Sequence, residues 1–470
     1  MTVTRPRAAP FALATLSAAW IVLLFAGLNP LLHGDSLGYV APGCMLWGPY
    51  PIALYDGARA PLYPLFLAAI QHVSSGTCAL DPAPRALALA TIVQLALYLG
   101  SLAYLHRALA GLRPGVRIAA LAAIAFSPLH ALFARQLLSE ALAGPLLLVL
   151  AAHLVRFARG RSPRDAAAVF GLAALLVLTR PNLLVPLLPA VAFVPWLGPR
   201  RVRLAALALA ATGLPLLAWI ALNGANTGHF RLTNLDGFAR TQLVYDRFDR
   251  VHREDAVLGE IMSAQHAADL GGGDADAQVV WRAMPRIRDA IDRMPFARRD
   301  PTTAGTSDLN AYLGRVSGYL VRENPGAVAR HAWRTFVELW DAPAIEIPAT
   351  DACSPGHGAP VRSAAIHALL VAAQRPASAL ARATLVLVPA LLLAGLRRRR
   401  ARAVALPALL WAMDLANLAT VAVFGVPQVR YVALAQPLLV LAAALAVQAL
   451  LEPAASPETT EAACTEHAAS

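Results

Sequence analysis

An acid, a phenol and a guanidinium stand close together in the first polar segment of an otherwise apolar chain. Asp35 and Tyr39 occur in the run HGDSLGY at 33–39, and Arg59 begins the run RAPLYP at 59–64, which includes Tyr63. A carboxylate can take a proton from a hydroxyl, and a guanidinium can hold a phosphate through two parallel hydrogen bonds. Charges beside a membrane span are costly, so the cluster predicts a site. The alternative is a solvated loop that only joins two helices.

Further arginines occur in short segments that we place on the outer side of the membrane, where arginine is normally scarce. Arg135 begins the run RQLLSE at 135–140, Arg180 lies in the run TRPN, and Arg430 precedes Tyr431. Together with Arg59 they predict an anion site, because guanidinium binds phosphate bidentately and keeps its charge when poorly hydrated. The chain has no GxxxxGK[ST] nucleotide loop, so we expect a lipid phosphate. The alternative is that each arginine only anchors its helix end at the headgroups.

Three polar side chains remain open to interpretation. Glu140 is placed to hold an acceptor or orient an arginine, or else it forms a simple ion pair with Arg135. Asp414 and Asn417 lie inside an apolar segment, where an acid needs a partner. Their depth favours a structural bond within the bundle.

The elements that must position these residues are apolar helices. The chain is 58% hydrophobic and 14% charged, and it contains apolar runs long enough for spanning helices. We read ten of them, at 11–32, 85–106, 117–134, 137–157, 165–179, 183–198, 203–222, 378–396, 403–424 and 431–451. The sequence therefore predicts an all-α polytopic membrane protein.

Charge sets the expected orientation. The 40 basic residues are all arginine, which is typical of GC-rich codon usage and suggests a bacterium. They gather in clusters at 5–7, 107–117, 156–164, 200–203 and 397–402, and with ten spans every cluster falls on one side. Because short cytoplasmic loops collect arginine, both termini are expected in the cytoplasm. The clusters form no basic stripe with interleaved aromatics, so no nucleic-acid partner is expected.

Cysteine spacing suggests a cross-link and no metal centre. Cys44 and Cys78 share the first outward loop, 33–84, where an oxidising compartment permits a disulfide, although Cys353 competes for either partner. There is no CxxC, HExxH or Cys/His zinc spacing. The first span has no clear cleavage site after it, so we expect a signal anchor.

Four regions follow from these assignments. They are a membrane domain over 1–222, an outward segment over 223–377, membrane helices over 378–451 and a disordered cytoplasmic tail over 452–470. A flexible break is expected at Gly271-Gly272-Gly273. The pattern from Asp308 to Trp340 is helical, with aromatics along one side and arginines among them. Such a helix either lies on the membrane interface or packs on the rest of the outward segment.

Several motifs follow one another along most of the chain. They are Gly34-Asp35-Ser36 with Tyr39, the run RAPLYPLF at 59–66, Ser127-Pro128, Arg135 with Leu138-Ser139-Glu140, Leu178-Thr179-Arg180-Pro181, Glu323-Asn324-Pro325, Leu339-Trp340 and Arg430-Tyr431. In this order they resemble a GT-C-type membrane glycosyltransferase. The chain is most similar to the bacterial branch that includes protein O-mannosyltransferase-like enzymes and the aminoarabinose transferase of lipid A.

The resemblance implies a multi-pass enzyme of the bacterial cytoplasmic membrane whose active site faces the periplasm. It implies transfer of a sugar from a polyprenyl-phosphate donor to a hydroxyl of a glycan, lipid or protein acceptor of the cell envelope. Asp35 matches the catalytic carboxylate of the first loop, Glu140 a second acidic position, and Arg59 the residue that contacts the lipid phosphate. Arg180 and Arg430 are further donor contacts, and Tyr39, Tyr63, Arg135 and Tyr431 are expected to contact substrate.

The chain departs from these relatives at one position. Ser36 follows Asp35 where many relatives have a second acid, which argues against a carboxylate pair that binds a metal. No nucleotide or redox cofactor is implied, because the donor carries its own activation. Two rival functions share the expected topology and phosphate site: a flippase or other transporter of lipid-linked sugars, and an O-antigen-type polymerase or ligase.

Overall fold

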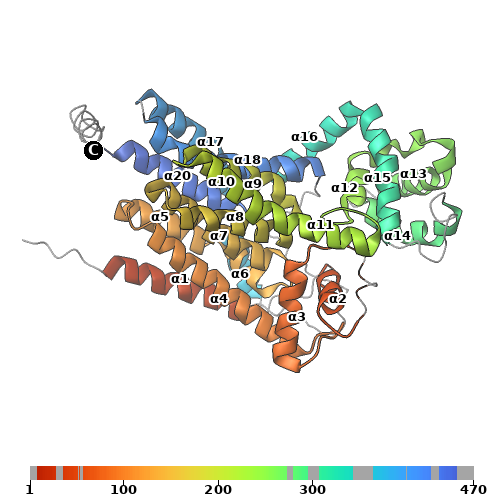
Figure 1. The fold of residues 1–470 in the computed structure, drawn as a ribbon, viewed down its shortest axis with the longest axis horizontal. Coiled ribbons are helices and arrows are strands. Elements are labelled where there is room, and N and C mark those ends of the chain that lie inside the picture. Colours follow the sequence, from red (N-terminus) through yellow and green to blue (C-terminus); the bar gives the residue numbers. More distant parts are fainter. Residues whose placement is uncertain are drawn as a thin grey trace, which may run out of the picture.

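The computed structural model is helical throughout the part of the chain that it describes, with no β-strand there. The described residues are 8–27, 35–50, 52, 55, 57–271, 279–294, 306–341, 364–398, 400–424 and 433–452. Figure 1 shows a layered bundle of long helices at one end and a second, smaller helical body, α12 to α15, at the other.

The bundle contains helices from both halves of the sequence. Its helices are α1 (Ala8–Gly27), α4 (Pro84–Ala108), α5 (Pro114–Ala125), α6 (Pro128–Arg135), α7 (Glu140–Gly160), α8 (Pro163–Thr179), α9 (Leu184–Leu197), α10 (Arg201–Ala208), α11 (Leu214–Thr227), α17 (Ala364–Arg397), α18 (Ala401–Phe424) and α20 (Gln436–Leu451). Phe157 of α7 and Phe170 of α8 are fully buried in the central core, where α18 and α20 also pack together.

Four helices of the described part are long and apolar enough to cross a membrane. They are Pro84–Ala108, Glu140–Gly160, Arg201–Thr227 and Ala403–Val423. Shorter apolar helices occur at Thr15–Gly27, Pro114–Ala125, Pro181–Leu197 and Gln436–Leu451. These helices support a membrane protein, while the count of ten spans stays a prediction.

Two expected spans differ in the structure. The run 117–134 is not one helix, because α5 ends at Ala125 and α6 begins at Pro128. The ring of Pro128 disfavours a helical conformation for Ser127, whose backbone is extended. The run 378–396 belongs to the longer helix α17, which begins at Ala364, within the region expected to be outward.

The smaller body has its own hydrophobic core. It is built from α12 (Asp236–Leu243), α13 (Ala256–Gly271), α14 (Val279–Asp289) and α15 (Thr306–Glu323), with short 3-10 turns between them. Phe238, Phe248, Met262 and Leu313 are among its buried side chains. After Asn324, α16 (Pro325–Asp341) leads back to the bundle and packs against α18. The expected single helix from 308 to 340 is therefore two helices.

The first outward loop folds into a helical hairpin of α2 (Leu37–Leu46) and α3 (Leu62–Ser75). A disulfide joins Cys44 and Cys78, whose Cα atoms are 5.3 Å apart, and this is the pairing that their shared loop predicts. Cys353 lies outside the described residues. The bond ties the end of α2 to the segment that leads into α4.

Arginines of three clusters, 107–117, 156–164 and 397–402, lie at helix ends on the side of the bundle away from this hairpin. The guanidinium of Arg159 donates to the carbonyl of Ala108, 2.7 Å away, and Arg398 donates to the carbonyl of Leu450 at 3.3 Å. Arg113 and Arg400 also donate to carbonyls of the last turn of α20. Cations stabilise the C-terminus of a helix, where carbonyls lack partners within the helix.

Candidate functional site

The structure brings Asp35 and Arg59 together at the mouth of a polar cluster. Asp35 immediately precedes the N-terminus of α2, and Arg59 lies just before α3. A nitrogen of the Arg59 guanidinium, Nη2, donates to Oδ1 of Asp35 at 2.8 Å. The side chains of Arg59 and Asp35 retain 23% and 33% of their exposure, so solvent or a ligand can reach both.

Tyr39 connects this pair to the interior. Its ring lies under the guanidinium of Arg59, 4.6 Å from centroid to Cζ, which permits a cation–π interaction. The other guanidinium nitrogen, Nη1, lies 3.4 Å from the Tyr39 hydroxyl. That hydroxyl is also within 3.1 Å of the hydroxyl of Ser139, which precedes α7.

A second ion pair lies deeper. Nη1 of Arg180, the residue that follows α8, is 2.6 Å from Oε2 of Glu140, the first residue of α7. The Ser139 hydroxyl donates to Oε2 of Glu140 and accepts from Nη1 of Arg180, each at 3.4 Å. The side chains of Arg180 and Glu140 are only 7% and 1% exposed. A buried pair of this kind depends on good geometry, because desolvation of two charges is costly.

Of the two readings of Glu140, its ion pair with Arg180 agrees with the one in which it orients an arginine. Arg135 instead donates to the carbonyl of Phe25 at 2.8 Å and to the hydroxyl of Thr91 at 3.3 Å. Its guanidinium also lies 3.9 Å from the centroid of the Phe25 ring. These contacts fasten α6 to α1 and α4, while the substrate contact expected of Arg135 stays a prediction.

Tyr63 supports the site from below. It has no exposed surface, and its ring meets that of Tyr39 edge-on with centroids 5.2 Å apart. Burial raises the pKa of Tyr63 well above its ordinary value, and the neighbouring Tyr39 and Glu140 raise it further. The phenol thus stays neutral and donates to Oε1 of Gln94 at 2.8 Å. Tyr63 was expected to touch substrate, but its burial assigns it to the framework.

Gln94 is a member of this framework that sequence reasoning missed. It lies fully buried in α4, and its amide donates to the carbonyls of Ala134 and Gln136 at 3.0 and 3.2 Å. These bonds hold the junction between α6 and α7, from which Ser139 and Glu140 project. An amide side chain within an apolar helix is costly to bury without hydrogen-bond partners, so Gln94 could have been singled out from the sequence on this ground.

The loop that carries Arg59 is held by residues in the last turn of α11 and beyond this helix. The backbone amide of Asn234 donates to the carbonyl of Gly57 at 2.8 Å, and the side-chain amide of Asn226 donates to the carbonyl of Tyr55 at 2.8 Å. Tyr55 in turn donates its hydroxyl to the carbonyl of Arg59. Gly57 has φ +69°, a conformation that favours glycine.

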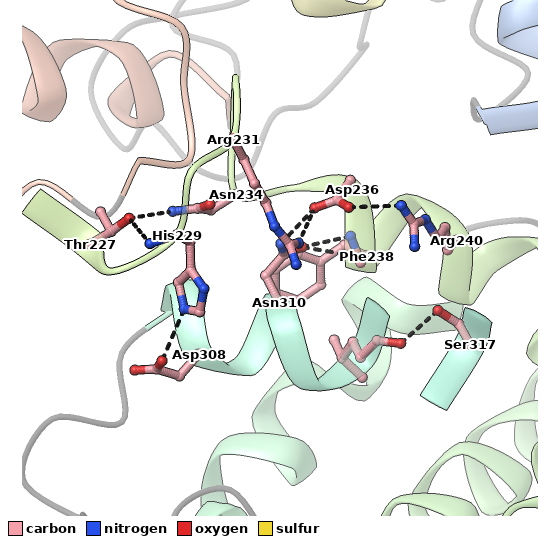
Figure 2. Close-up of polar contacts among 12 residues, drawn as sticks. Thr227, His229, Arg231, Asn234, Asp236, Phe238, Arg240, Asp308, Asn310 and Ser317 are labelled. Carbon is pink, nitrogen blue, oxygen red and sulfur yellow. Dashed lines mark hydrogen bonds and ion pairs between the residues drawn. The ribbon is translucent and has the colours of Figure 1, made fainter. Parts of the chain in front are cut away.

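The clamp is braced by the smaller helical body (Figure 2). Arg231 and Asn310 both donate to Oδ1 of Asp236, at 2.8 and 3.0 Å. His229 lies 3.1 Å from Oδ1 of Asp308. The segment between α11 and α12 is thus tied to α15 on one side and to the Arg59 loop on the other.

Three further expectations concern residues within or after α18. Arg430 and Tyr431 lie outside the described residues. Asp414 is 1% exposed, and neither of its carboxylate oxygens has a hydrogen-bond partner, so the expected structural bond is not formed by Asp414. The described part of the chain contains no group of three or more His, Cys, Asp or Glu side chains suited to a metal.

The arrangement is a polar cluster with an acid–guanidinium pair at each end. The outer pair is accessible and the inner pair is enclosed, and Tyr39 with Ser139 connects them. An anion that reached Arg59 would compete with Asp35 and release its carboxylate for proton transfer. Comparison with protein-family models, with curated proteins and with solved structures found no match.

Proposed function

We propose that the protein is a membrane glycosyltransferase that moves a sugar from a polyprenyl phosphate to an acceptor hydroxyl at the outer face of a bacterial cytoplasmic membrane. The observation that carries the proposal is the contact between Asp35 and Arg59 at the accessible end of the polar cluster. A base and an anion-binding group 2.8 Å apart are what this transfer requires. The apolar helices and the motif resemblance agree with it.

The proposed reaction has one proton transfer and one substitution. The Asp35 carboxylate accepts the proton of the acceptor hydroxyl as that oxygen forms a bond to the anomeric carbon of the sugar. The bond between this carbon and the phosphate oxygen breaks, and the electron pair leaves with the polyprenyl phosphate. Arg59 stabilises the growing negative charge on the phosphate, a type of interaction that usually contributes most to catalysis.

The inner pair has a supporting role in this proposal. Arg180 and Glu140 neutralise one another away from solvent, and the Ser139 hydroxyl touches both of them and Tyr39. They therefore fix the position of the Tyr39 phenol under Arg59. We assign Glu140 and Arg180 as positioning residues, and Asp35 and Arg59 as the groups that touch substrate.

The test is release of polyprenyl phosphate and formation of glycosylated product by purified protein supplied with a polyprenyl-phosphate sugar. Asp35→Asn keeps the size of the side chain but cannot accept a proton, so transfer should slow by about 100- to 10,000-fold. The matched control is Asp246→Asn, which also removes an acid from a partly exposed ion pair, with Arg247. Near-wild-type transfer by Asp35→Asn would remove Asp35 from the mechanism.

Substitution of Arg59 gives a second, independent test of the proposed function. Arg59→Ala should weaken donor binding, whereas Arg59→Lys should retain part of it, because lysine keeps the charge but lacks the planar fork. A transporter would move the lipid-linked sugar across the membrane without forming a glycosylated product. Transport with no product in the wild type would therefore replace the proposed function with that rival.

A further inference from the structure

One face of α16 bears large exposed side chains although the helix is firmly packed on its other face. Ala327, Thr335 and Leu339 are buried, and through them α16 lies against α18 and the smaller helical body. On the opposite face Trp333 is 68% exposed and Val337 is also exposed. The Trp333 ring stacks on Phe336 with centroids 5.9 Å apart, which fixes its direction.

A basic residue flanks this aromatic face. Arg330 lies one turn before Trp333 and is exposed, whereas the guanidinium of Arg334 makes a side-chain hydrogen bond with Tyr245 of the smaller body. The acids of the helix, Glu338 and Asp341, stand together in its last turn. The first three turns of the exposed face therefore present tryptophan and arginine with no acid among them.

The position of α16 says which surface this face meets. The helix connects the smaller body to α18, and α18 contains the candidate span Ala403–Val423. In Figure 1, α16 lies between the smaller body and the bundle, next to α18. Contact with a helix that contains a candidate membrane span is expected to place α16 near the membrane surface.

We propose that the exposed face of α16 lies in the membrane interface and binds anionic lipid headgroups. Trp333 and Val337 enter the boundary between headgroups and acyl chains, where tryptophan is enriched in membrane proteins. Arg330 meets the lipid phosphates. A helix with aromatic and basic residues on one face binds membranes by this combination of apolar burial and charge attraction.

The adjoining helix α15 does not share this role. Its residues Tyr312, Leu313, Val316 and Leu320 are buried in the core of the smaller body. The interfacial surface is thus confined to α16, and it anchors the smaller body at a set height above the bilayer. This inference is independent of the proposed glycosyl transfer.

Site-directed spin labelling of the full chain tests the proposal. In a background with Cys353→Ser and Cys464→Ser and the Cys44–Cys78 disulfide intact, labels are attached at Trp333→Cys or Val337→Cys. Arg288→Cys, at an exposed position on α14, is the matched control. The protein is reconstituted into vesicles of phosphatidylcholine with phosphatidylglycerol, and collisions with oxygen and with a water-soluble nickel complex are compared.

The labels at 333 and 337 should favour oxygen over nickel and lie about 5–10 Å below the phosphate level. The label at 288 should favour nickel. In vesicles of phosphatidylcholine alone, labels at 333 should move toward the aqueous phase, because the attraction to Arg330 is lost. Nickel accessibility at 333 equal to that at 288 would overturn the proposal and leave the face open to a protein partner. Depth unchanged by anionic lipid would overturn the headgroup binding.

Discussion

Gly57 offers a sharp test of how the Arg59 loop is held. Its φ of +69° is a conformation that L side chains rarely adopt, and any added Cβ would also meet two asparagines. The Cβ of Gly57→Ala would lie 2.2 Å from Oδ1 of Asn223 and 2.5 Å from Nδ2 of Asn234. Both asparagines are almost fully buried, and Asn223 donates to the carbonyl of Arg231, so neither can simply swing away.

The expected cost has two parts. Placing alanine in the left-handed region costs about 1–2 kcal/mol. Forcing a methyl group into a packed site costs about 1–3 kcal/mol more. Gly76→Ala separates the two parts, because Gly76 has φ +74° but no atom within 4 Å of its Cβ position. We therefore expect Gly57→Ala to lower the free energy of unfolding by about 2–5 kcal/mol and Gly76→Ala by only the first part.

Denaturant unfolding in detergent, run on both variants and the wild type, measures this difference. Asn223→Gly in the Gly57→Ala background should recover part of the packing cost, and the double-mutant cycle isolates that contact. Because Gly57 is two residues from Arg59, donor turnover should fall in Gly57→Ala and stay near wild type in Gly76→Ala. Equal destabilisation by the two alanines would show that the asparagine clamp contributes nothing and would refute the reasoning.

Four other predictions can be checked in the same preparations. Glu140→Gln should destabilise the protein by about 3–5 kcal/mol in thermal unfolding, because it leaves the buried Arg180 charge uncompensated. The double variant Glu140→Gln with Arg180→Met should cost less than this single change. A larger cost for the double variant would contradict the prediction. Cys44→Ser with Cys78→Ser should cost about 3–4 kcal/mol in the chain-entropy model, and mass mapping without reduction should find the two cysteines linked in the wild type; free thiols would oppose it. Asp414→Leu should leave the protein as stable or raise its unfolding free energy by about 1–3 kcal/mol, because the buried carboxyl makes no hydrogen bond; strong destabilisation would mean that the acid has a partner. A periplasm-activated reporter fused after Ala225 should be active and one fused at Arg399 silent, and the reverse at either point would break the expected topology.

Much of the local structure follows from the sequence. Apolar length predicts the helical class, and the shared loop of Cys44 and Cys78 predicts their pairing. The break at Ser127-Pro128 is also predictable from the sequence, because a residue before proline avoids the helical conformation. The length of the apolar run nevertheless led to α5 and α6 being read as one span. These features depend on neighbours in sequence, and neighbours suffice to predict them.

The partners within the site depend on tertiary structure. Arg135 and Glu140 are five residues apart, but the extended backbone at Gln136 turns α6 away from α7, and the two side chains face different helices. Glu140 instead meets Arg180, which only the packing of α7 on α8 brings within 2.6 Å. No local signal predicts a contact across such a separation.

The amphipathic pattern from 308 to 340 shows the same division. Periodicity determined that both segments are helices with one apolar face. It did not determine what covers that face, because burial in a protein core and burial in a bilayer select the same residue types. Only the packing of α15 into the smaller body, and of α16 on α18 with Trp333 left exposed, decided which face meets protein and which stays exposed.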